Sequence, residues 1–208
     1  MKILIIANGS IKKIEKYKTL IKNSDKVVCV DGGLNNFAKI YNDFSRVDYL
    51  LGDLDSAKIE YIKHISQDKI IKKNNQDESD LEFTFKFIKE NFPKAELILI
   101  GAIGNRLDHT FANVLTLKKI SNANIKIVSD NEEIFLVKNR LDIKNKSGKT
   151  LSVIPITDVE SLNLVGLKWE LSNKNLKFGW INGISNIVTK NNASISLKNG
   201  EVLVFIKD

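Results

Sequence analysis

The sequence has 208 residues, of which 43% are hydrophobic and 27% charged, a composition typical of a globular protein with a sizeable core. Its apolar runs are strand-sized and far shorter than the roughly 20 residues of a membrane span, so no membrane partner is expected. The net charge of +7 comes from lysines dispersed along the whole chain, which argues against a nucleic-acid partner. With one cysteine, Cys29, inside an apolar run, we expect a buried thiol and a cytoplasmic protein.

The first two thirds of the chain alternate short apolar runs with helix-like segments. Strands are expected at 2–9, 26–33, 47–56, 95–104 and 124–131. Helices are expected between them, at 13–23, 34–44, 80–92 and 108–120, with Pro93 marking the end of the third. Because the apolar runs are nearly continuous, each strand is expected to be covered on both faces. This order predicts an α/β domain with a mostly parallel sheet flanked by helices.

From about residue 132 the pattern changes to short β-type runs separated by Gly, Asn, Ser and Asp. These runs lie at 133–139, 149–156, 161–167, 176–179, 185–190, 193–199 and 201–208. No helix-length periodic segment occurs among them, which favours a small all-β sandwich or barrel. We therefore expect two domains, 1–143 and 144–208, with no low-complexity linker between them.

Acidic residues follow several of the expected strands. They are Asp31 with Gly32 and Gly33, then Asp53 and Asp55, then Asp77, Glu78 and Asp80 at the start of a helix, and finally Asp108 near Arg106. In a parallel sheet these strand ends lie along one edge, where open α/β proteins bind ligands. So many carboxylates along one edge would repel one another unless a cation offsets their charge. Mg²⁺, a hard cation that prefers oxygen ligands, suits such a cluster.

Each of these features also has a simpler interpretation when it is taken alone. An Asp after a strand often forms a turn or caps a helix, and DESDLE could do no more than cap a helix. No Ser-His-Asp or Cys-His arrangement is apparent, and the two histidines lack metal-ligand spacing. His64 reads as a surface residue, whereas His109, beside Asp108, is a candidate ligand contact.

A series of motifs resembles the thiamine pyrophosphokinase family. In order they are DGGLN, GDLDS, QDESDLE, GAIGNRLDHTFAN and, in the last third, GLKWELSN, LKFG and GISN. The resemblance covers Asp31 to Asn186 and implies an N-terminal α/β domain, a C-terminal β-sandwich and a homodimer. It further implies that the enzyme transfers the pyrophosphoryl group of ATP to the hydroxyl of thiamine with Mg²⁺, giving thiamine diphosphate and AMP.

The resemblance also implies roles for single residues. The expected metal ligands are Asp53, Asp55 and Asp80, with Asp108 and Arg106 completing the catalytic set. The expected ATP contacts are Asp31, Gly32, Gly33, Asn35, Asp77 and Arg106. The expected thiamine contacts are Trp169, Ser185 and Asn186, which in the family complete a site with the partner subunit. Two positions depart from the family pattern, namely Asn36 in place of a common Arg and Asn105 in place of a common Gly.

Such a transfer needs positioning and charge neutralisation more than covalent catalysis, so the lack of a nucleophilic Ser or Cys is expected. We expect direct attack of the thiamine hydroxyl on the β-phosphorus, with Asp108 and Asp80 both open as candidates for the general base. Two alternatives are a Mg²⁺-dependent glycosyltransferase that uses Asp53 and Asp55, and a non-catalytic nucleotide-binding module. Without the resemblance, Trp169 would be read as a core residue.

Overall fold

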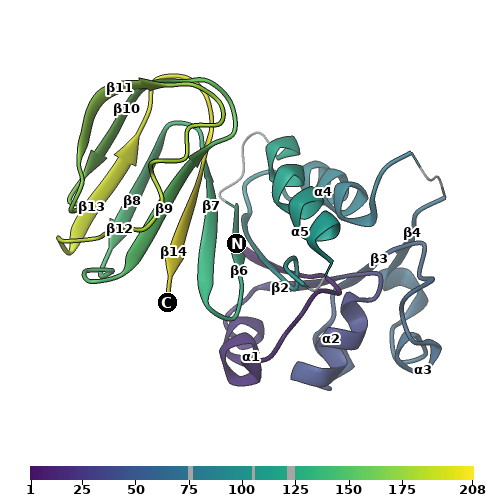
Figure 1. Cartoon of the computed structure of the whole chain (residues 1–208). Helices are drawn as coiled ribbons and strands as arrows, with labels where there is room; N and C mark the ends of the chain where they lie inside the picture. Colours follow the sequence, from purple (N-terminus) through teal and green to yellow (C-terminus); the bar gives the residue numbers. More distant parts are fainter. Residues whose placement is uncertain (75–76, 105, 121–124) are drawn as a thin grey trace. The chain divides into compact units, whose positions relative to one another are not determined.

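The computed structural model describes residues 1–74, 77–104, 106–120 and 125–208, and it contains two units, Met1–Asp130 and Asn131–Asp208 (Figure 1). The division lies before the position near residue 143 that the sequence suggested. The reason is that β7 (Glu132–Val137) and β8 (Arg140–Lys144) pair with strands of the second unit, β14 (Val202–Lys207) and β13 (Asn192–Ser196) respectively.

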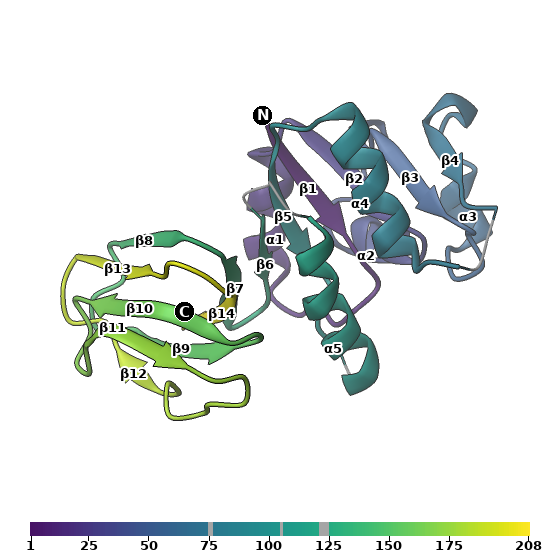
Figure 2. The ribbon, with the colours of Figure 1, turned by 90° about the horizontal axis from the view of Figure 1, so that it is seen from above.

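The first unit is built on a parallel sheet with the strand order β6-β5-β1-β2-β3-β4. These strands are β1 (Lys2–Ile6), β2 (Lys26–Val30), β3 (Tyr49–Gly52), β4 (Ile70–Lys72), β5 (Glu96–Ile100) and β6 (Ile125–Val128). The sequence predicted all of them except β4, a three-residue strand at the edge of the sheet. Figure 2 shows β1, β2 and β3 side by side beneath α4 and α5.

Helices cover both faces of this sheet, as the continuous apolar runs indicated. They are α1 (Ile14–Lys22), α2 (Gly33–Ile40), α3 (Ile59–Ile62), α4 (Asp80–Asn91) and α5 (Leu107–Thr116), with short 3₁₀ turns at Phe44–Arg46, Gln67–Lys69 and Leu117–Lys119. Helices α4 and α5 lie on one face, and α1, α2 and α3 lie on the other (Figure 1). The four longer helices match the predicted segments, whereas the single-turn α3 has no periodic signal in the sequence.

The core of the first unit explains why its strands are apolar throughout. On the α1–α2 side, Leu4, Cys29, Leu50 and Phe37 are fully buried in one cluster. Burial confirms the expectation for Cys29 and raises the pKa of its thiol well above the ordinary value, so the thiol stays neutral. On the other face, Phe85 of α4 is among the buried apolar side chains.

The second unit consists of two antiparallel sheets, with the strand orders β12-β9-β14-β7 and β11-β10-β13-β8. The strands not yet named are β9 (Thr150–Pro155), β10 (Val159–Val165), β11 (Leu171–Leu176) and β12 (Asn186–Ile187). Buried residues alternate along β9 and β13, and those of both sheets meet in one core, for example Val153, Leu162, Ile195 and Val204. This arrangement agrees with the all-β domain expected after the first unit.

None of the helices in the described part of the chain has the length and apolarity that a membrane crossing requires.

Candidate active site

The carboxyl-terminal edge of the parallel sheet carries a cavity of about 770 Å³. It lies where the strand order reverses, because the chain runs outward from β1 through β2, β3 and β4 and then returns to β5 on the other side of β1. Open α/β sheets bind ligands outside the strand ends at such a point. The loops after β1, β2, β3 and β5 and the first turns of α4 and α5 line this cavity.

Three carboxylates from adjacent strand ends meet in this cavity. One oxygen each of Asp31, Asp53 and Asp55 lies within 4.8 Å of the others. Asp31 follows β2 and is buried, with its backbone N–H bonded to the Leu51 carbonyl at 2.7 Å and its carboxylate accepting from the Ser56 N–H at 3.2 Å. The structure therefore places Asp31, which the sequence assigned to ATP binding, beside two of the expected metal ligands.

The backbone between the two paired acids has an uncommon conformation. Leu54 has a φ of 69°, in the left-handed region that a branched side chain rarely adopts. Its side chain packs against the apolar core of the first unit, which helps to hold this turn. Asp53 accepts a hydrogen bond from the Asp55 N–H at 3.3 Å, and Asp55 accepts one from the Ser56 hydroxyl at 2.8 Å. The turn thus holds both carboxylates at the cavity.

Asp80 lines the same cavity from the first residue of α4. The helix is already capped by its neighbours, because Ser79 and Glu82 bond reciprocally to each other's backbone N–H groups. Asp80 is not needed for that cap. Its Oδ1 atom instead forms an ion pair with the Nζ atom of Lys73 at 2.9 Å.

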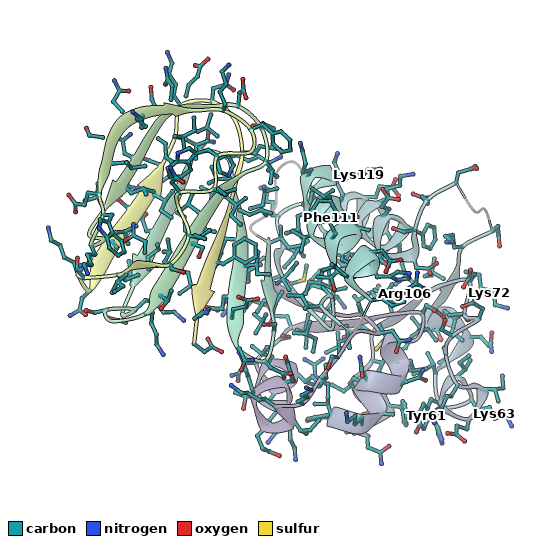
Figure 3. The ribbon with its side chains drawn as sticks, in the orientation of Figure 1. Tyr61, Lys63, Lys72, Arg106, Phe111 and Lys119 are labelled. Carbon is teal, nitrogen blue, oxygen red and sulfur yellow. The ribbon has the colours of Figure 1, made fainter. Side chains whose placement is uncertain are left out.

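Arg106 reaches the cavity from the start of α5 (Figure 3). It pairs with Asp108 at 2.5 Å, and this hydrogen bond to the guanidinium holds the pKa of Asp108 at about 2. Asp108 and Asp77 are both exposed and do not line the cavity, whereas His109 does. Asn105 lies outside the described residues.

The two glycines of DGGLN allow close packing next to the cavity. A Cβ atom on Gly33 would lie 1.8 Å from the Ile6 carbonyl oxygen, and one on Gly32 would lie 2.3 Å from the Asn8 side-chain nitrogen. Neither glycine lines the cavity, although Asn8 does. The glycines therefore bring the start of α2 against the end of β1.

The two asparagines that follow connect α2 to the surrounding loops. Asn35 donates to the Ser56 carbonyl at 2.9 Å. Asn36 donates to the carbonyls of Ala7 and Gly9, each at 2.8 Å. Asn36 thus holds the loop after β1, and neither asparagine lines the cavity.

Several polar residues of the cavity had no assigned role from the sequence. Ser10 lies in the loop after β1, and two residues of α5 support the loop after β5. Thr110 accepts from the Gly104 N–H at 3.1 Å, and Asn113 donates to the Ala102 carbonyl at 2.8 Å. The motif GAIGNRLDHTFAN contains these α5 residues, and their hydrogen bonds hold the start of α5 against the loop that precedes it.

The expected thiamine contacts belong to the second unit. Trp169 has 55% of its surface exposed, which excludes the alternative that it is a core residue. Buried Asn186 accepts from the Trp169 N–H at 3.1 Å and donates to its carbonyl at 2.7 Å, so it fixes the backbone that carries the indole. Ser185 is exposed and donates its N–H to the Ser152 hydroxyl at 3.0 Å. The ammonium of Lys168 lies 4.7 Å from the centroid of the indole ring.

The chain was compared with known families and proteins. The family model for the thiamin pyrophosphokinase catalytic domain matches residues 17–129, and the one for the thiamin pyrophosphokinase vitamin B1 binding domain matches residues 138–202. Thiamine pyrophosphokinase 1 of Oryza sativa subsp. japonica is 27% identical over 81% of this chain and 74% of its own length. Thiamine pyrophosphokinase 2 of the same organism is 30% identical over 77% of this chain and 70% of its own length.

Solved structures share the fold. A thiamine pyrophosphokinase from Bacillus subtilis has a TM-score of 0.82 at 23% identity and covers 100% of this chain and 99% of its own. The yeast thiamin pyrophosphokinase has a TM-score of 0.80 at 20% identity, covering 99% and 86%. Together, the two matched domains and the cavity between the strand ends lead to one conclusion: this chain belongs to the thiamin pyrophosphokinase family.

Proposed function

We propose that this chain transfers the pyrophosphoryl group of ATP to the hydroxyl of thiamine, giving thiamine diphosphate and AMP. The family and the names of the curated relatives indicate thiamine pyrophosphokinase activity. The observation that carries the proposal is the acidic cavity at the sheet edge, whose carboxylates Asp31, Asp53, Asp55 and Asp80 all lie inside the residues matched by the catalytic-domain model. A polyphosphate with bound cations is the kind of ligand that such a cavity accepts.

The cluster of Asp31, Asp53 and Asp55 is the part of the cavity best suited to hold Mg²⁺. Mg²⁺ binds oxygen ligands at about 2.0–2.1 Å, so ligand oxygens on opposite sides of the ion lie about 4.2 Å apart. The three oxygens, within 4.8 Å of one another, are close enough for one ion to reach all three carboxylates. When bound, the ion would neutralise phosphate charge and orient the transferred group. Asp80, the third expected metal ligand, lines the same cavity.

Other side chains of the cavity would bind and orient the nucleotide. The Arg106 guanidinium can form paired hydrogen bonds to phosphate oxygens, in exchange for or in addition to its bond with Asp108. In the reaction, the thiamine hydroxyl oxygen forms a bond to the β-phosphorus, and the bond from that phosphorus to the oxygen bridging to the α-phosphorus breaks. AMP leaves with that oxygen, and the hydroxyl proton passes to a base or to solvent.

Because Asp108 is held ionised by Arg106 at a pKa of about 2, it is a poor proton acceptor at neutral pH.

The thiamine ring is proposed to stack on Trp169 of the second unit. The exposed indole offers a flat face, and thiamine is a flat cationic heterocycle, a pairing that cation–π attraction favours. Asn186 would act mainly by fixing the indole, since both of its side-chain polar atoms are bonded to the Trp169 backbone.

We further propose a homodimer in which the thiamine site is completed by the partner. The proposed homodimer is supported by large apolar side chains that are exposed in the single chain and that a protein–protein interface would bury. They are Leu107, Phe111, Phe178, Ile181 and Ile184.

A product assay tests this function. The protein is incubated with ATP, Mg²⁺ and thiamine, and the products are separated by chromatography. We expect thiamine diphosphate and AMP in equal amounts, and no product when EDTA replaces Mg²⁺. Formation of ADP and thiamine monophosphate would contradict the proposed transfer. A parallel incubation with a nucleotide sugar tests the glycosyltransferase alternative, which hydrolysis of that sugar without thiamine turnover would favour.

A further inference from the structure

One buried lysine lies directly behind the acidic cavity. Lys73 follows β4, and its backbone N–H bonds to the Gly52 carbonyl at 3.0 Å, next to the turn that carries Asp53. Its side chain is 4% exposed. Among the described residues, Lys73 and Asp31 are the two charged side chains that are buried, and both lie at this edge of the sheet. Burying a lysine is costly unless opposite charges compensate it, so its surroundings are informative.

The ammonium of Lys73 contacts the segment that begins α4. Its Nζ atom lies 2.9 Å from Asp80 Oδ1 and donates to the Glu78 carbonyl at 3.0 Å. Burial by itself lowers the pKa of Lys73, but the hydrogen bond and charge of Asp80, with the charges of Asp53 and Glu78, outweigh it and raise that pKa. Lys73 is therefore a fixed positive charge at neutral pH.

This contact has a consequence for Asp80. The Oδ1 atom, paired with Lys73, is shielded from solvent, while the Asp80 side chain is 26% exposed and lines the cavity. The Oδ2 atom is therefore the oxygen that a ligand in the cavity can reach. Lys73 is also joined through its backbone to Gly52, the residue before Asp53, so its buried positive charge offsets part of the negative charge of the carboxylate cluster.

We propose that Lys73 is a positioning residue that holds Asp80 with one oxygen toward the cavity and weakens divalent-cation binding to the nucleotide-free enzyme. This inference rests on the proposed function, because it assumes that Asp31, Asp53 and Asp55 bind the metal. With Lys73 in place, the cluster binds a free ion loosely and gains full affinity when ATP phosphates supply further ligands. Loss of the lysine charge should therefore tighten metal binding and slow turnover at the same time.

A purely structural role for Lys73, as a tether of α4, makes the opposite prediction for the metal. Losing a tether would loosen the site, so it would weaken cation binding or leave it unchanged. Four variants separate the two roles. Lys73→Met removes charge and donors, Lys73→Gln keeps a donor without the charge, and Lys73→Arg keeps the charge. Lys86→Met is the matched control, because it removes an exposed lysine that pairs with Glu78 at 2.5 Å.

The experiment titrates Mn²⁺ into the nucleotide-free proteins and measures free Mn²⁺ by electron paramagnetic resonance. We expect Lys73→Gln and Lys73→Met to bind Mn²⁺ at least about fivefold more tightly than the wild type, because the lost charge is buried beside Asp80 and is therefore poorly screened by salt. Lys73→Arg and Lys86→Met should stay within about twofold, since the first keeps the charge and the second lies in solvent. The value of kcat should fall about tenfold in Lys73→Met and recover in part in Lys73→Arg, with the thiamine KM unchanged.

The outcomes distinguish this inference from the proposed function. Thermal melting and circular dichroism establish which variants are folded, and Lys73→Gln keeps a donor near Asp80 should Lys73→Met fail to fold. Unchanged or weaker Mn²⁺ binding by folded Lys73→Gln would overturn the role of Lys73 while leaving the metal site intact. Failure of the wild type to bind Mn²⁺ would instead overturn the metal site, and the inference with it.

Discussion

The contact between Gly33 and β1 allows a stability prediction. The change is Gly33→Ala, which adds a single methyl group at the first residue of α2. In an isolated helix this substitution would be favourable by up to about 1 kcal/mol, because alanine is the better helix former. Here the added Cβ atom would lie 1.8 Å from the Ile6 carbonyl oxygen. The close contact therefore predicts that Gly33→Ala destabilises the fold, whereas helix propensity alone predicts that it stabilises the fold.

The size of the effect follows from what surrounds that contact. Real Cβ atoms essentially never approach other atoms closer than 3.0 Å, so α2 or β1 must shift by more than 1 Å. The clashing atom is a backbone oxygen of β1, and this strand is paired with β2 on one side and β5 on the other. Such an atom cannot rotate away as a side chain can. We therefore expect a net loss of about 3 kcal/mol in the free energy of unfolding, near the upper end of overpacking effects.

Urea unfolding followed by circular dichroism measures this loss. The control is Gly148→Ala, where a Cβ atom meets nothing within 4 Å and only the φ of 81° opposes the substitution. It should cost about 1–2 kcal/mol, from backbone strain alone. An unfolding free energy of Gly33→Ala within about 0.5 kcal/mol of the wild type, together with a raised KM for ATP, would refute the packing argument. It would favour the direct nucleotide contact that the sequence suggested.

Three further predictions concern the site. Asp53→Asn should lower kcat by about 100-fold or more and abolish the rise in melting temperature caused by Mg²⁺, with an unchanged circular dichroism spectrum; near-normal turnover would exclude a metal role. Arg106→Met should return the pKa of Asp108 from about 2 toward 3.8, as followed by carboxyl NMR. Because the pKa of Asp108 is lower in the folded than in the unfolded state, its pairing with Arg106 stabilises the fold above pH 3.8, and this stabilisation is lost as the pH falls toward 2. An Asp108 pKa that stays near 2 in Arg106→Met would contradict the assigned cause. Trp169→Ala should raise the thiamine KM about tenfold, with the ATP KM and the melting temperature nearly unchanged; a large drop in melting temperature with a normal thiamine KM would show a packing role instead.

Much of the first unit could be predicted because its strands are buried on both faces. Continuous apolar runs gave β1, β2, β3, β5 and β6, and helical spacing gave the four longer helices. The strand β4 was missed because Ile70–Lys72 is too short and too exposed to carry a pattern. The expected boundary near residue 143 lies after β7 and β8, whose antiparallel pairing with β14 and β13 places them in the second unit and has no signal in the sequence.

The acidic residues could be located from the sequence, but their grouping could not. Parallel strands bring Asp31 and Asp53 to the same edge, and only the register of β2 against β3 shows that Asp31 lies close enough to share an ion with Asp53 and Asp55. The pairing of Asp80 with a lysine was equally hidden. Lys73 lies in the stretch IIKKNN and has the sequence context of a surface residue, yet tertiary packing buries it.

The most direct test of the central claim follows the β-phosphorus of ATP. The enzyme is given thiamine, Mg²⁺ and ATP that carries radioactive phosphorus at the β position, and the products are separated at early times. Transfer of an intact pyrophosphoryl group predicts that the label appears in thiamine diphosphate at the same rate as unlabelled AMP. Label that remains in ADP while thiamine monophosphate accumulates would mean successive transfers of the γ-phosphoryl group, and would contradict the account.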